Sequence, residues 1–200
     1  MSKIYLLSGT HLSGKSSLMK QIDNLLNDNL LSKEDIKIFH EINYGLFKIG
    51  FLLNGKGSID ELLFSQLQSL ILYINIIKFY LKHDDIYKTI IIDRSFIDTI
   101  IYTRYFLKNI HNNYKLPQEF IDLEKEGLSL LNKLHHILIM PCNFSISKLS
   151  DKDRMNLKSR AEIHDIFTST FKQWDQKLYT TLPDAPIEER SQMLLQIINL

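Results

Sequence analysis

The sequence lacks a second cysteine, a long uninterrupted apolar run and an excess of charge of one sign. Its single cysteine, Cys142, excludes an internal disulfide and a cysteine-rich zinc site. The longest apolar stretch, around residues 70–81, is interrupted by Asn75 and Lys78, which argues against a membrane-spanning helix. A formal net charge of +1 argues against an extended surface for nucleic acid.

The composition is otherwise that of a folded domain. Hydrophobic residues make up 44% and charged residues 24% of the 200 residues, which excludes a disordered or fibrous chain. This length suits a single domain over residues 1–200, and neither an internal repeat nor a linker divides it. Only a short apolar run follows Lys3, so we expect no signal peptide. We therefore expect a cytoplasmic protein with no nucleic-acid or membrane partner.

A phosphate-binding motif stands near the start of the chain. Residues 9–16 read Gly-Thr-His-Leu-Ser-Gly-Lys-Ser, which is the G-x-x-x-x-G-K-[ST] pattern. The apolar run 4–7 precedes the motif and the amphipathic run 17–22 follows it, as the strand and the helix around such a loop require. A glycine turn that happens to carry a lysine is the alternative, and the flanking runs argue against it.

Each key residue of this motif has a chemical reason to be there. Gly9 and Gly14 let the backbone turn tightly and bring its N–H groups against phosphate oxygens. Lys15 places a positive charge on the β- and γ-phosphates, and the Ser16 hydroxyl can ligate Mg²⁺. The sequence therefore predicts binding of ATP with Mg²⁺. The predicted binding residues are Gly9, Thr10, His11, Leu12, Ser13, Gly14, Lys15, Ser16 and Ser17.

Apolar runs of strand-like and helix-like length alternate along the chain, which is typical of an α/β domain with a parallel sheet. We expect strands at residues 4–7, 36–39, 89–93, 135–140 and 179–182. We expect helices at residues 15–30, 44–53, 58–82, 95–108, 117–134 and 187–198, with another through Ile166 to Leu178. The predicted fold is a doubly wound parallel five-stranded sheet flanked by helices, with ligands at the carboxyl ends of its strands.

The expected helix over residues 58–82 has a clear start signal. Ser58 and Glu61 form the signature of a capping box. Apolar residues cover enough of the helix circumference to predict burial on more than one side. The same surface would permit a homodimer, or it could simply be core.

A charged pair ends the third expected strand. Asp93 and Arg94 follow the apolar run 89–92, so their side chains can reach a triphosphate bound at the same sheet edge. The carboxylate can hold hydrated Mg²⁺ or accept a proton, and the guanidinium can hold an acceptor phosphate or stabilise the transferring phosphoryl group. Burying an unmatched charge pair is costly, which favours a functional role. Ser95 and Asp98 fit equally as caps of the next helix or as functional residues.

These residues resemble a kinase signature. Asp93-Arg94-Ser95, followed by Asp98 and Tyr102, resembles the D-R-[YS]-x-x-[SD]-x-x-x-Y signature of thymidylate kinases. It is also similar to the E-R-S element of deoxynucleoside kinases. Residues 61–64, Glu-Leu-Leu-Phe, resemble the E-L-L-L-F opening of a long helix in thymidylate kinases. The resemblance implies a P-loop kinase fold and ATP-dependent phosphoryl transfer to a small nucleoside or nucleotide.

A further part of the resemblance concerns a lid. Arg154 and the Ser-Arg-Ala-Glu segment 159–162 resemble the arginine-bearing lid and its R-x-E continuation in both families. The resemblance implies a lid near residues 148–162 that closes over the triphosphate, with Arg154 as its catalytic cation. Lys158 and Arg160 are the other lid candidates. A mixed-charge run of this kind is otherwise more often a solvated face.

The end of the second expected strand departs from the kinase pattern. Residues 40–42 read His-Glu-Ile where both families commonly have Glu-Pro, so Glu41 matches their acidic residue without the proline. For a nucleoside acceptor, the resemblance implies that Glu41 is the general base for a sugar hydroxyl. For a monophosphate acceptor, Glu41 would bind sugar or magnesium instead. A strand-end carboxylate in solvent is the third reading.

The helix over residues 58–82 also departs from the thymidylate kinase pattern. Gln68 stands where those enzymes carry an arginine, and an uncharged amide cannot supply the same charge-assisted contact to a phosphate. Either Gln66 or Gln68 could instead hydrogen-bond a base edge, although a solvent-facing glutamine fits as well. Tyr44 and Phe64 belong to a set of aromatic residues that could line an acceptor pocket or form core.

The leading hypothesis is an ATP-dependent phosphotransferase that moves the γ-phosphoryl group to a nucleoside or nucleoside monophosphate. A P-loop ATPase switch and a catalytically lost regulator, each acting on a protein partner, are the alternatives. The candidate catalytic residues are Lys15, Asp93, Arg94, Arg154 and Glu41. The candidate substrate-binding residues are Glu41, Tyr44, Phe64, Gln68, Arg94 and Asp98, and the candidate magnesium ligands are Ser16 and Asp93.

Overall fold

The computed structural model describes residues 2–28, 31–51, 53, 57–109, 114–141, 157–173 and 176–198. Several predictions from the sequence fall outside these ranges. They concern Cys142, Arg154, Trp174, the front part of the expected lid over 148–156, and the side chain of Lys158.

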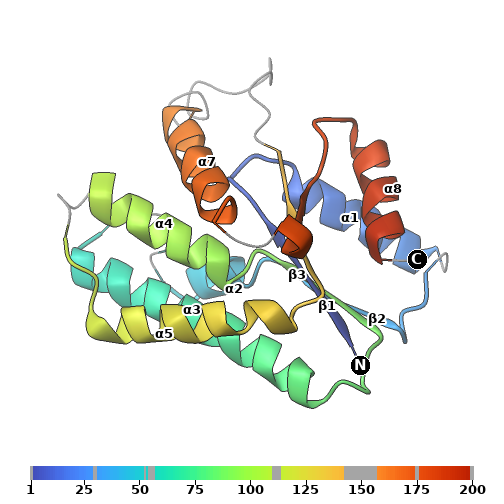
Figure 1. Cartoon of the computed structure of the whole chain (residues 1–200), viewed down its shortest axis with the longest axis horizontal. Coiled ribbons are helices and arrows are strands. Elements are labelled where there is room, and N and C mark those ends of the chain that lie inside the picture. Colours follow the sequence, from blue (N-terminus) through green and yellow to red (C-terminus); the bar gives the residue numbers. More distant parts are fainter. Residues whose placement is uncertain are drawn as a thin grey trace.

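A parallel sheet forms the centre of the fold (Figure 1). Within the described residues it has five strands in the order β2-β3-β1-β4-β5, and every neighbouring pair is parallel. The strands are β1 (Lys3–Ser8), β2 (Ile36–Phe39), β3 (Thr89–Asp93), β4 (His136–Ile139) and β5 (Tyr179–Thr181). β3 is buried along its whole length because its apolar residues face helices on both sides.

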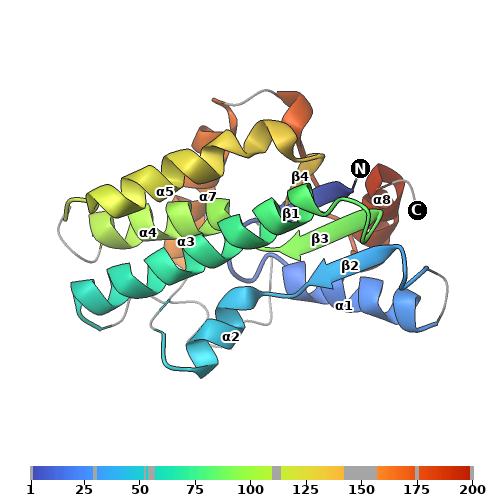
Figure 2. The ribbon, with the colours of Figure 1, turned by 90° about the horizontal axis from the view of Figure 1, so that it is seen from below.

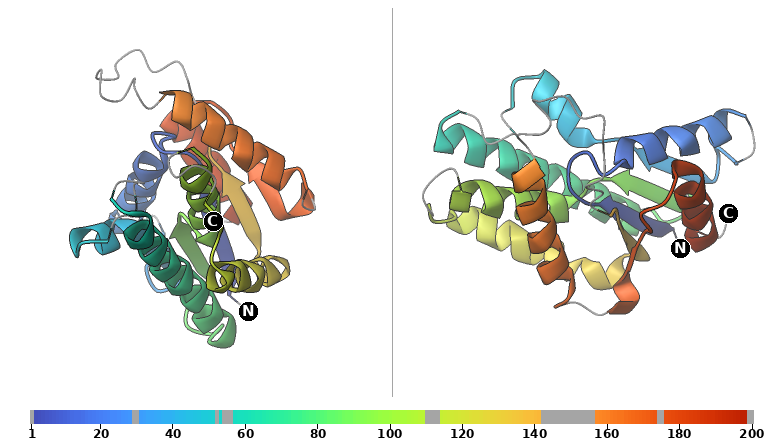
Figure 3. Two further views of the ribbon diagram at one scale, coloured as in Figure 1. Left: turned by 90° about the vertical axis from the view of Figure 1, so that its left-hand side faces the viewer. Right: turned by 90° about the horizontal axis from the view of Figure 1, so that it is seen from above.

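The helices lie in two layers, one on each face of the sheet. They are α1 (Lys15–Asn27), α2 (Ile42–Lys48), α3 (Ile59–Lys82), α4 (Phe96–Asn109), α5 (Gln118–Ser129), α7 (Leu157–Phe171) and α8 (Ile187–Ile198). Short 3₁₀ turns, η1 (Leu131–Lys133) and η2 (Gln176–Leu178), precede β4 and β5. Figure 3 shows the sheet between the layers, and Figure 2 shows α2 projecting from the end of β2.

The alternation of side chains along β1 explains the two layers. Ile4 and Leu6 pack into a core with α3, α4, α5 and α7, whereas Tyr5 and Leu7 pack into a second core with α1 and α8. Successive side chains of a strand point to opposite faces, so one apolar strand supplies both cores. The prediction of a doubly wound five-stranded α/β fold is confirmed.

The start of α3 follows the sequence signal. The Ser58 hydroxyl accepts from the Glu61 amide at 3.3 Å, and the Glu61 carboxylate accepts from the Ser58 amide at 2.9 Å. This reciprocal pair is the predicted capping box. By length and composition alone α3 could cross a membrane, but half of its most apolar 18-residue window is buried inside the protein, as in any core helix.

The expected helix over residues 44–53 ends early, at Lys48. Gly50 has φ +99° and lies just after the last turn, where the left-handed conformation favours glycine. Its amide bonds the Phe47 carbonyl at 3.1 Å, and the Phe51 amide bonds the Leu46 carbonyl at 3.1 Å. These two bonds form a Schellman motif, and this glycine stop was overlooked in the sequence.

Three other helix ends were also predicted too late. α1 ends at Asn27, α5 ends at Ser129 before η1, and α7 ends at Phe171, which leaves Leu178 in η2. α1 stops within the last turn predicted for it, whereas α5 and α7 stop more than one turn before their predicted ends. Boundaries are the part of a helix that local pattern specifies least.

Candidate functional site

The phosphate loop connects β1 to α1 and relies on its two glycines. Gly9 has φ +146°, and a Cβ built there would lie 3.0 Å from the Met140 Cβ. Gly14 has φ +87° and is the N-cap of α1, which begins at Lys15. Both positions therefore require a residue without a side chain, as the motif predicts.

Lys15 is buried at the centre of the loop. Its ammonium group donates to the carbonyls of Gly9 at 2.7 Å and Thr10 at 2.6 Å, and to the Ser13 hydroxyl at 3.1 Å. Burial, and then the nearby Arg94 guanidinium, lowers the pKa of Lys15 to about 8. The loop is thus folded around the Lys15 ammonium group, which could donate to phosphate oxygens in place of the loop carbonyls.

Helix α4 holds the other side of the loop. The Gly9 amide donates to the Asp98 carboxylate at 3.2 Å, and the His11 amide donates to the Tyr102 hydroxyl at 2.8 Å. Ser95 caps α4, since its hydroxyl accepts from the Ile97 amide at 3.1 Å. Ser95 therefore acts as the cap, whereas the buried Asp98 fixes the start of the phosphate loop.

Asp93 ends β3 with its side chain buried. Burial raises the pKa of Asp93 to about 6, against the lowering effects of Lys15 and Arg94. One of its carboxylate oxygens has no hydrogen-bond partner among the described residues. A buried oxygen in that state suits hydrated Mg²⁺, and the Ser16 hydroxyl at the start of α1 is exposed for the same ion.

The described residues contain no group of three or more His, Cys, Asp or Glu side chains that could hold a metal ion by themselves.

Arg94 joins the ends of β3 and β2. Its Nε lies 2.6 Å from the Glu41 carboxylate, as an ion pair without the alignment of a hydrogen bond, and its guanidinium lies 5.6 Å from the centre of the Tyr102 ring. Burial opposes this charge, but Tyr102, Glu41 and Asp98 raise the pKa of Arg94 overall. Its φ of +65° is costly for a residue with a side chain, and such strain is concentrated at functional sites.

A cavity of about 360 Å³ opens beside the phosphate loop. His11 from the loop and the Glu41–Arg94 pair line it. Helices complete the wall: Asn43, Tyr44 and Phe47 from α2; Gln66 from α3; Asp98, Thr99, Tyr102, Tyr105 and Phe106 from α4; Ser159 and Ile163 from α7. Leu53 lines it as well. The volume and the mixture of aromatic and polar groups suit a small organic ligand.

Two predicted substrate residues lie away from this cavity. Phe64 is 57% exposed and stacks on Phe51 with ring centres 5.7 Å apart, and Gln68 is half-buried and does not line the cavity. Gln66, in contrast, is buried and lines it. Two residues along a helix correspond to a turn of roughly 200°, so side chains at 66 and 68 lie on nearly opposite sides of α3.

Of the three lid candidates, only Arg160 has a side chain that the structure describes. Arg160 is fully buried in α7, so it belongs to the packed interior and not to an exposed lid surface. Its neighbour Ser159 and the following Ile163 line the cavity instead. Arg154 lies outside the described residues.

Arg190 in α8 is a site residue that our reading of the sequence missed. Its guanidinium donates to the Ser13 carbonyl of the phosphate loop at 3.2 Å. Two glutamates precede it, so locally the sequence looks like the solvated first turn of a helix. Only the packing of α8 beside α1 places it against the loop.

A β-strand, this phosphate loop and the helix after it define a P-loop α/β domain. No protein-family model and no curated protein matches the chain. Solved structures do. Thymidylate kinase from Ehrlichia chaffeensis is 18% identical with a TM-score of 0.64, over 98% of this chain and 98% of that one. Thymidylate kinase from Candida albicans is 16% identical with a TM-score of 0.59, over 99% and 91%.

A third similar structure is the NadR protein in complex with NR, 13% identical with a TM-score of 0.57. It matches all of this chain, which spans 52% of that protein's chain. This chain therefore has the P-loop α/β fold of these thymidylate kinases, as its sequence motifs predict.

Proposed function

We propose that this protein is a phosphotransferase that moves the γ-phosphoryl group of ATP to a nucleoside. The observation that carries the proposal is the shared wall between the phosphate loop and the cavity. His11 belongs to the loop and lines the cavity, and Asp98 contacts the loop amide of Gly9 from the same wall. A ligand in the cavity would therefore lie next to a triphosphate on the loop, as phosphoryl transfer requires.

The donor side is assigned to the loop. Its amides and Lys15 would bind the phosphates, and Ser16 and Asp93 would hold magnesium, directly or through water. The ion would supply charge neutralisation at the β- and γ-oxygens. Lys15 already lies within hydrogen-bond distance of three loop oxygens, so it can exchange these partners for phosphate oxygens with little movement.

The acceptor side is assigned to the cavity. Tyr44 and Phe47 from α2 offer aromatic faces on which a nucleobase could stack. The Gln66 amide donates to the Leu53 carbonyl at 3.3 Å, which leaves its oxygen as an acceptor. The Asn43 oxygen accepts from Ser69 at 2.6 Å, which leaves its NH₂ as a donor. One donor and one acceptor suit the hydrogen-bonding edge of a base.

The charges of the cavity favour a nucleoside over a monophosphate. Among the lining residues that the structure describes, Arg94 is the only lysine or arginine, and it faces two carboxylates, Glu41 and Asp98. The acceptor phosphate would add negative charge to this wall. In the proposed reaction, the sugar hydroxyl oxygen attacks the γ-phosphorus, its proton passes to Glu41, and the bond to the β,γ-bridging oxygen breaks to release ADP.

A nucleoside monophosphate is the second candidate acceptor. Arg94 favours it, because its guanidinium could bind an acceptor phosphate if it released Glu41. Arg154 is proposed as a further cation over the γ-phosphate. A homodimer through α3 and a cytoplasmic location remain predictions.

The test is a reaction of the protein with ATP, Mg²⁺ and a panel of nucleosides and nucleoside monophosphates, with ADP and product followed by mass. We expect a nucleoside to be phosphorylated with one ADP released per product. Product from monophosphates alone would mean that the acceptor is a monophosphate and that Arg94 binds its phosphate. ATP binding with no phosphorylated acceptor would contradict the proposal and favour a switch or regulator that acts on a protein partner.

A further inference from the structure

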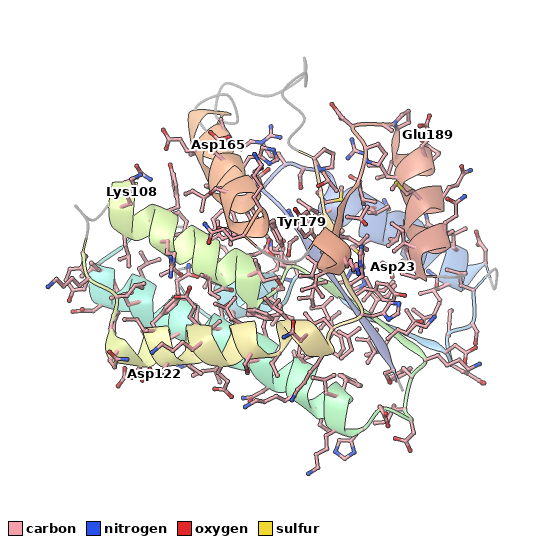
Figure 4. The ribbon with its side chains drawn as sticks, viewed as in Figure 1. Asp23, Lys108, Asp122, Asp165, Tyr179 and Glu189 are labelled. Atoms are coloured by element: carbon pink, nitrogen blue, oxygen red, sulfur yellow. The ribbon has the colours of Figure 1, made fainter. Side chains whose placement is uncertain are left out.

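Arg190 is a buried arginine in the first turn of α8. It is 7% exposed, although the two residues before it, Glu188 and Glu189, are exposed. Figure 4 shows Glu189 projecting from the outer side of α8. Arg190 therefore lies on the inner side of the helix, which faces the phosphate loop.

The position of Arg190 continues an apolar stripe. Leu194 and Ile198 follow it at intervals of four residues, and both are buried in the same core as Leu18 and Ile22 of α1. An apolar side chain would extend this stripe to the end of the helix. A guanidinium buried there is costly unless its N–H groups are bonded, so its hydrogen-bond partners must explain why an arginine stands at this position.

The guanidinium bridges two segments. One terminal nitrogen donates to the Ser13 carbonyl of the phosphate loop at 3.2 Å, and the other donates to the Asp184 carboxylate at 3.2 Å. A Cβ built on Gly14 would lie 3.2 Å from the first of these nitrogens. Arg190 therefore fits closely against the Ser13–Gly14 peptide, and Gly14 leaves it the necessary room.

The contact fixes the direction of one peptide. In a trans peptide the C=O and the next N–H point in opposite directions. Because the Ser13 carbonyl is held toward α8, the Gly14 amide points away from α8. A peptide beside a glycine with φ +87° has little steric resistance to reorientation, so an outside contact can decide its direction.

We propose that Arg190 is a positioning residue of the phosphate loop: it holds the Ser13 carbonyl so that the Gly14 amide is directed at the bound phosphate. The inference rests on the proposed binding of ATP by the loop. Its consequence is preorganisation, since the loop pays less to adopt its binding conformation when the peptide is already oriented. The Asp184 carboxylate keeps the guanidinium in place at the other end.

The test compares Arg190→Met with Arg104→Met. Methionine retains much of the apolar stem but cannot donate to Ser13. Arg104 is a matched control, because it also forms an ion pair, with Glu124 at 2.6 Å, but its side chain is 55% exposed and does not line the cavity. We expect Arg190→Met to raise the Kd and KM for Mg·ATP by about tenfold with no change in the acceptor KM. Arg104→Met should leave all three constants within about twofold.

A spectroscopic readout separates positioning from general weakening. The chain has seven glycines, so selective ¹⁵N-glycine labelling gives a simple amide spectrum. Mg·ATP should shift the Gly14 amide resonance of the parent protein. In Arg190→Met that resonance should broaden or split as the peptide samples two orientations, and Arg190→Lys, which keeps a charged donor group, should restore a single shifted resonance.

The outcomes distinguish the inference from the proposed function. A parent protein that fails to bind Mg·ATP contradicts the proposed function itself. A parent that binds, together with an Arg190→Met variant whose Kd lies within twofold and whose Gly14 resonance is unchanged, overturns the role of Arg190. If Arg190→Met does not fold, Arg190→Lys is compared with Arg190→Gln, and equal Kd values for that pair combined with a parent-like Gly14 resonance would also overturn it.

Discussion

The two halves of the site are built differently. On the proposed donor side, Thr10, Ser13 and Lys15 are each at most 5% exposed, and residues of both α4 and α8 hydrogen-bond to the loop. On the acceptor side, Tyr44 and Phe47 are 60% and 50% exposed, and no residue of α2 is buried. A preformed donor site beside an open acceptor site suits a protein that binds one constant triphosphate and closes part of its surface around the other substrate.

The largest effect is expected from the centre of the donor half. Lys15→Ala removes the charge proposed to balance the β- and γ-phosphates, so phosphoryl transfer should fall by at least about 10³-fold. The protein should still fold: Lys15→Ala gives up three hydrogen bonds to loop oxygens, but it also removes a charge that burial disfavours. Product formation and thermal unfolding check both points, with Lys20→Ala, an exposed lysine of α1, as the control. Turnover within tenfold of the parent would contradict the assignment.

The acceptor half is tested at Glu41. Glu41→Gln keeps the shape of the side chain but removes the proposed base, so kcat should fall by about 10²–10³-fold while the KM for ATP stays nearly constant. Glu126→Gln is the matched control, because Glu126 also forms an ion pair, with Lys78, at a partly exposed position. A large change in the ATP KM would mean that Glu41 belongs to the donor half, and unchanged kcat would exclude its role as base.

The two halves should also respond differently to pH. Lys15 has a pKa lowered to about 8 by burial and by Arg94, so it is charged below that pH and loses its proton above it. If only the charged form binds ATP well, the Kd for ATP should rise by roughly tenfold between pH 7 and pH 9. Calorimetry at several pH values checks this. The Kd of a nucleoside should stay nearly constant over this range. A tenfold rise in the nucleoside Kd as well would contradict a separate response of the two halves to pH.

The smallest effect is expected on the exposed helix α2. A Cβ added to Gly45 meets nothing within 4 Å, so Gly45→Ala should stabilise the protein by about 0.5–1 kcal/mol through helix propensity. Gly50 also has open space but has φ +99°, so Gly50→Ala should destabilise it by about 1 kcal/mol. Denaturant unfolding of the pair separates backbone conformation from packing. Equal changes in the free energy of unfolding for the two variants would show that the positive φ of Gly50 is not what ends this helix.

What the sequence could predict depends on how local the cause is. The bounds of β3 and α8 match the prediction, since an apolar β-branched run and an amphipathic segment each carry their own pattern. The phosphate loop is predictable for the same reason. The place of Gln66 in the cavity wall depends on how α3 is turned about its axis, and the contact of Arg190 with the loop depends on how α8 packs. No local sequence pattern contains either. The phosphate loop itself was therefore predicted more completely than the residues that other helices bring to it and to the cavity.

The most direct test of a single transfer site is to measure the binding of two bisubstrate compounds, in which adenosine is joined to a nucleoside through four or five phosphates. The four-phosphate compound mimics ATP in transfer to a nucleoside, and the fifth phosphate stands for a monophosphate acceptor. If the loop and the cavity form one transfer site for a nucleoside, the four-phosphate compound should bind at least about 10²-fold more tightly than ATP, and more tightly than the longer one. Binding of both compounds no tighter than ATP would contradict the single transfer site.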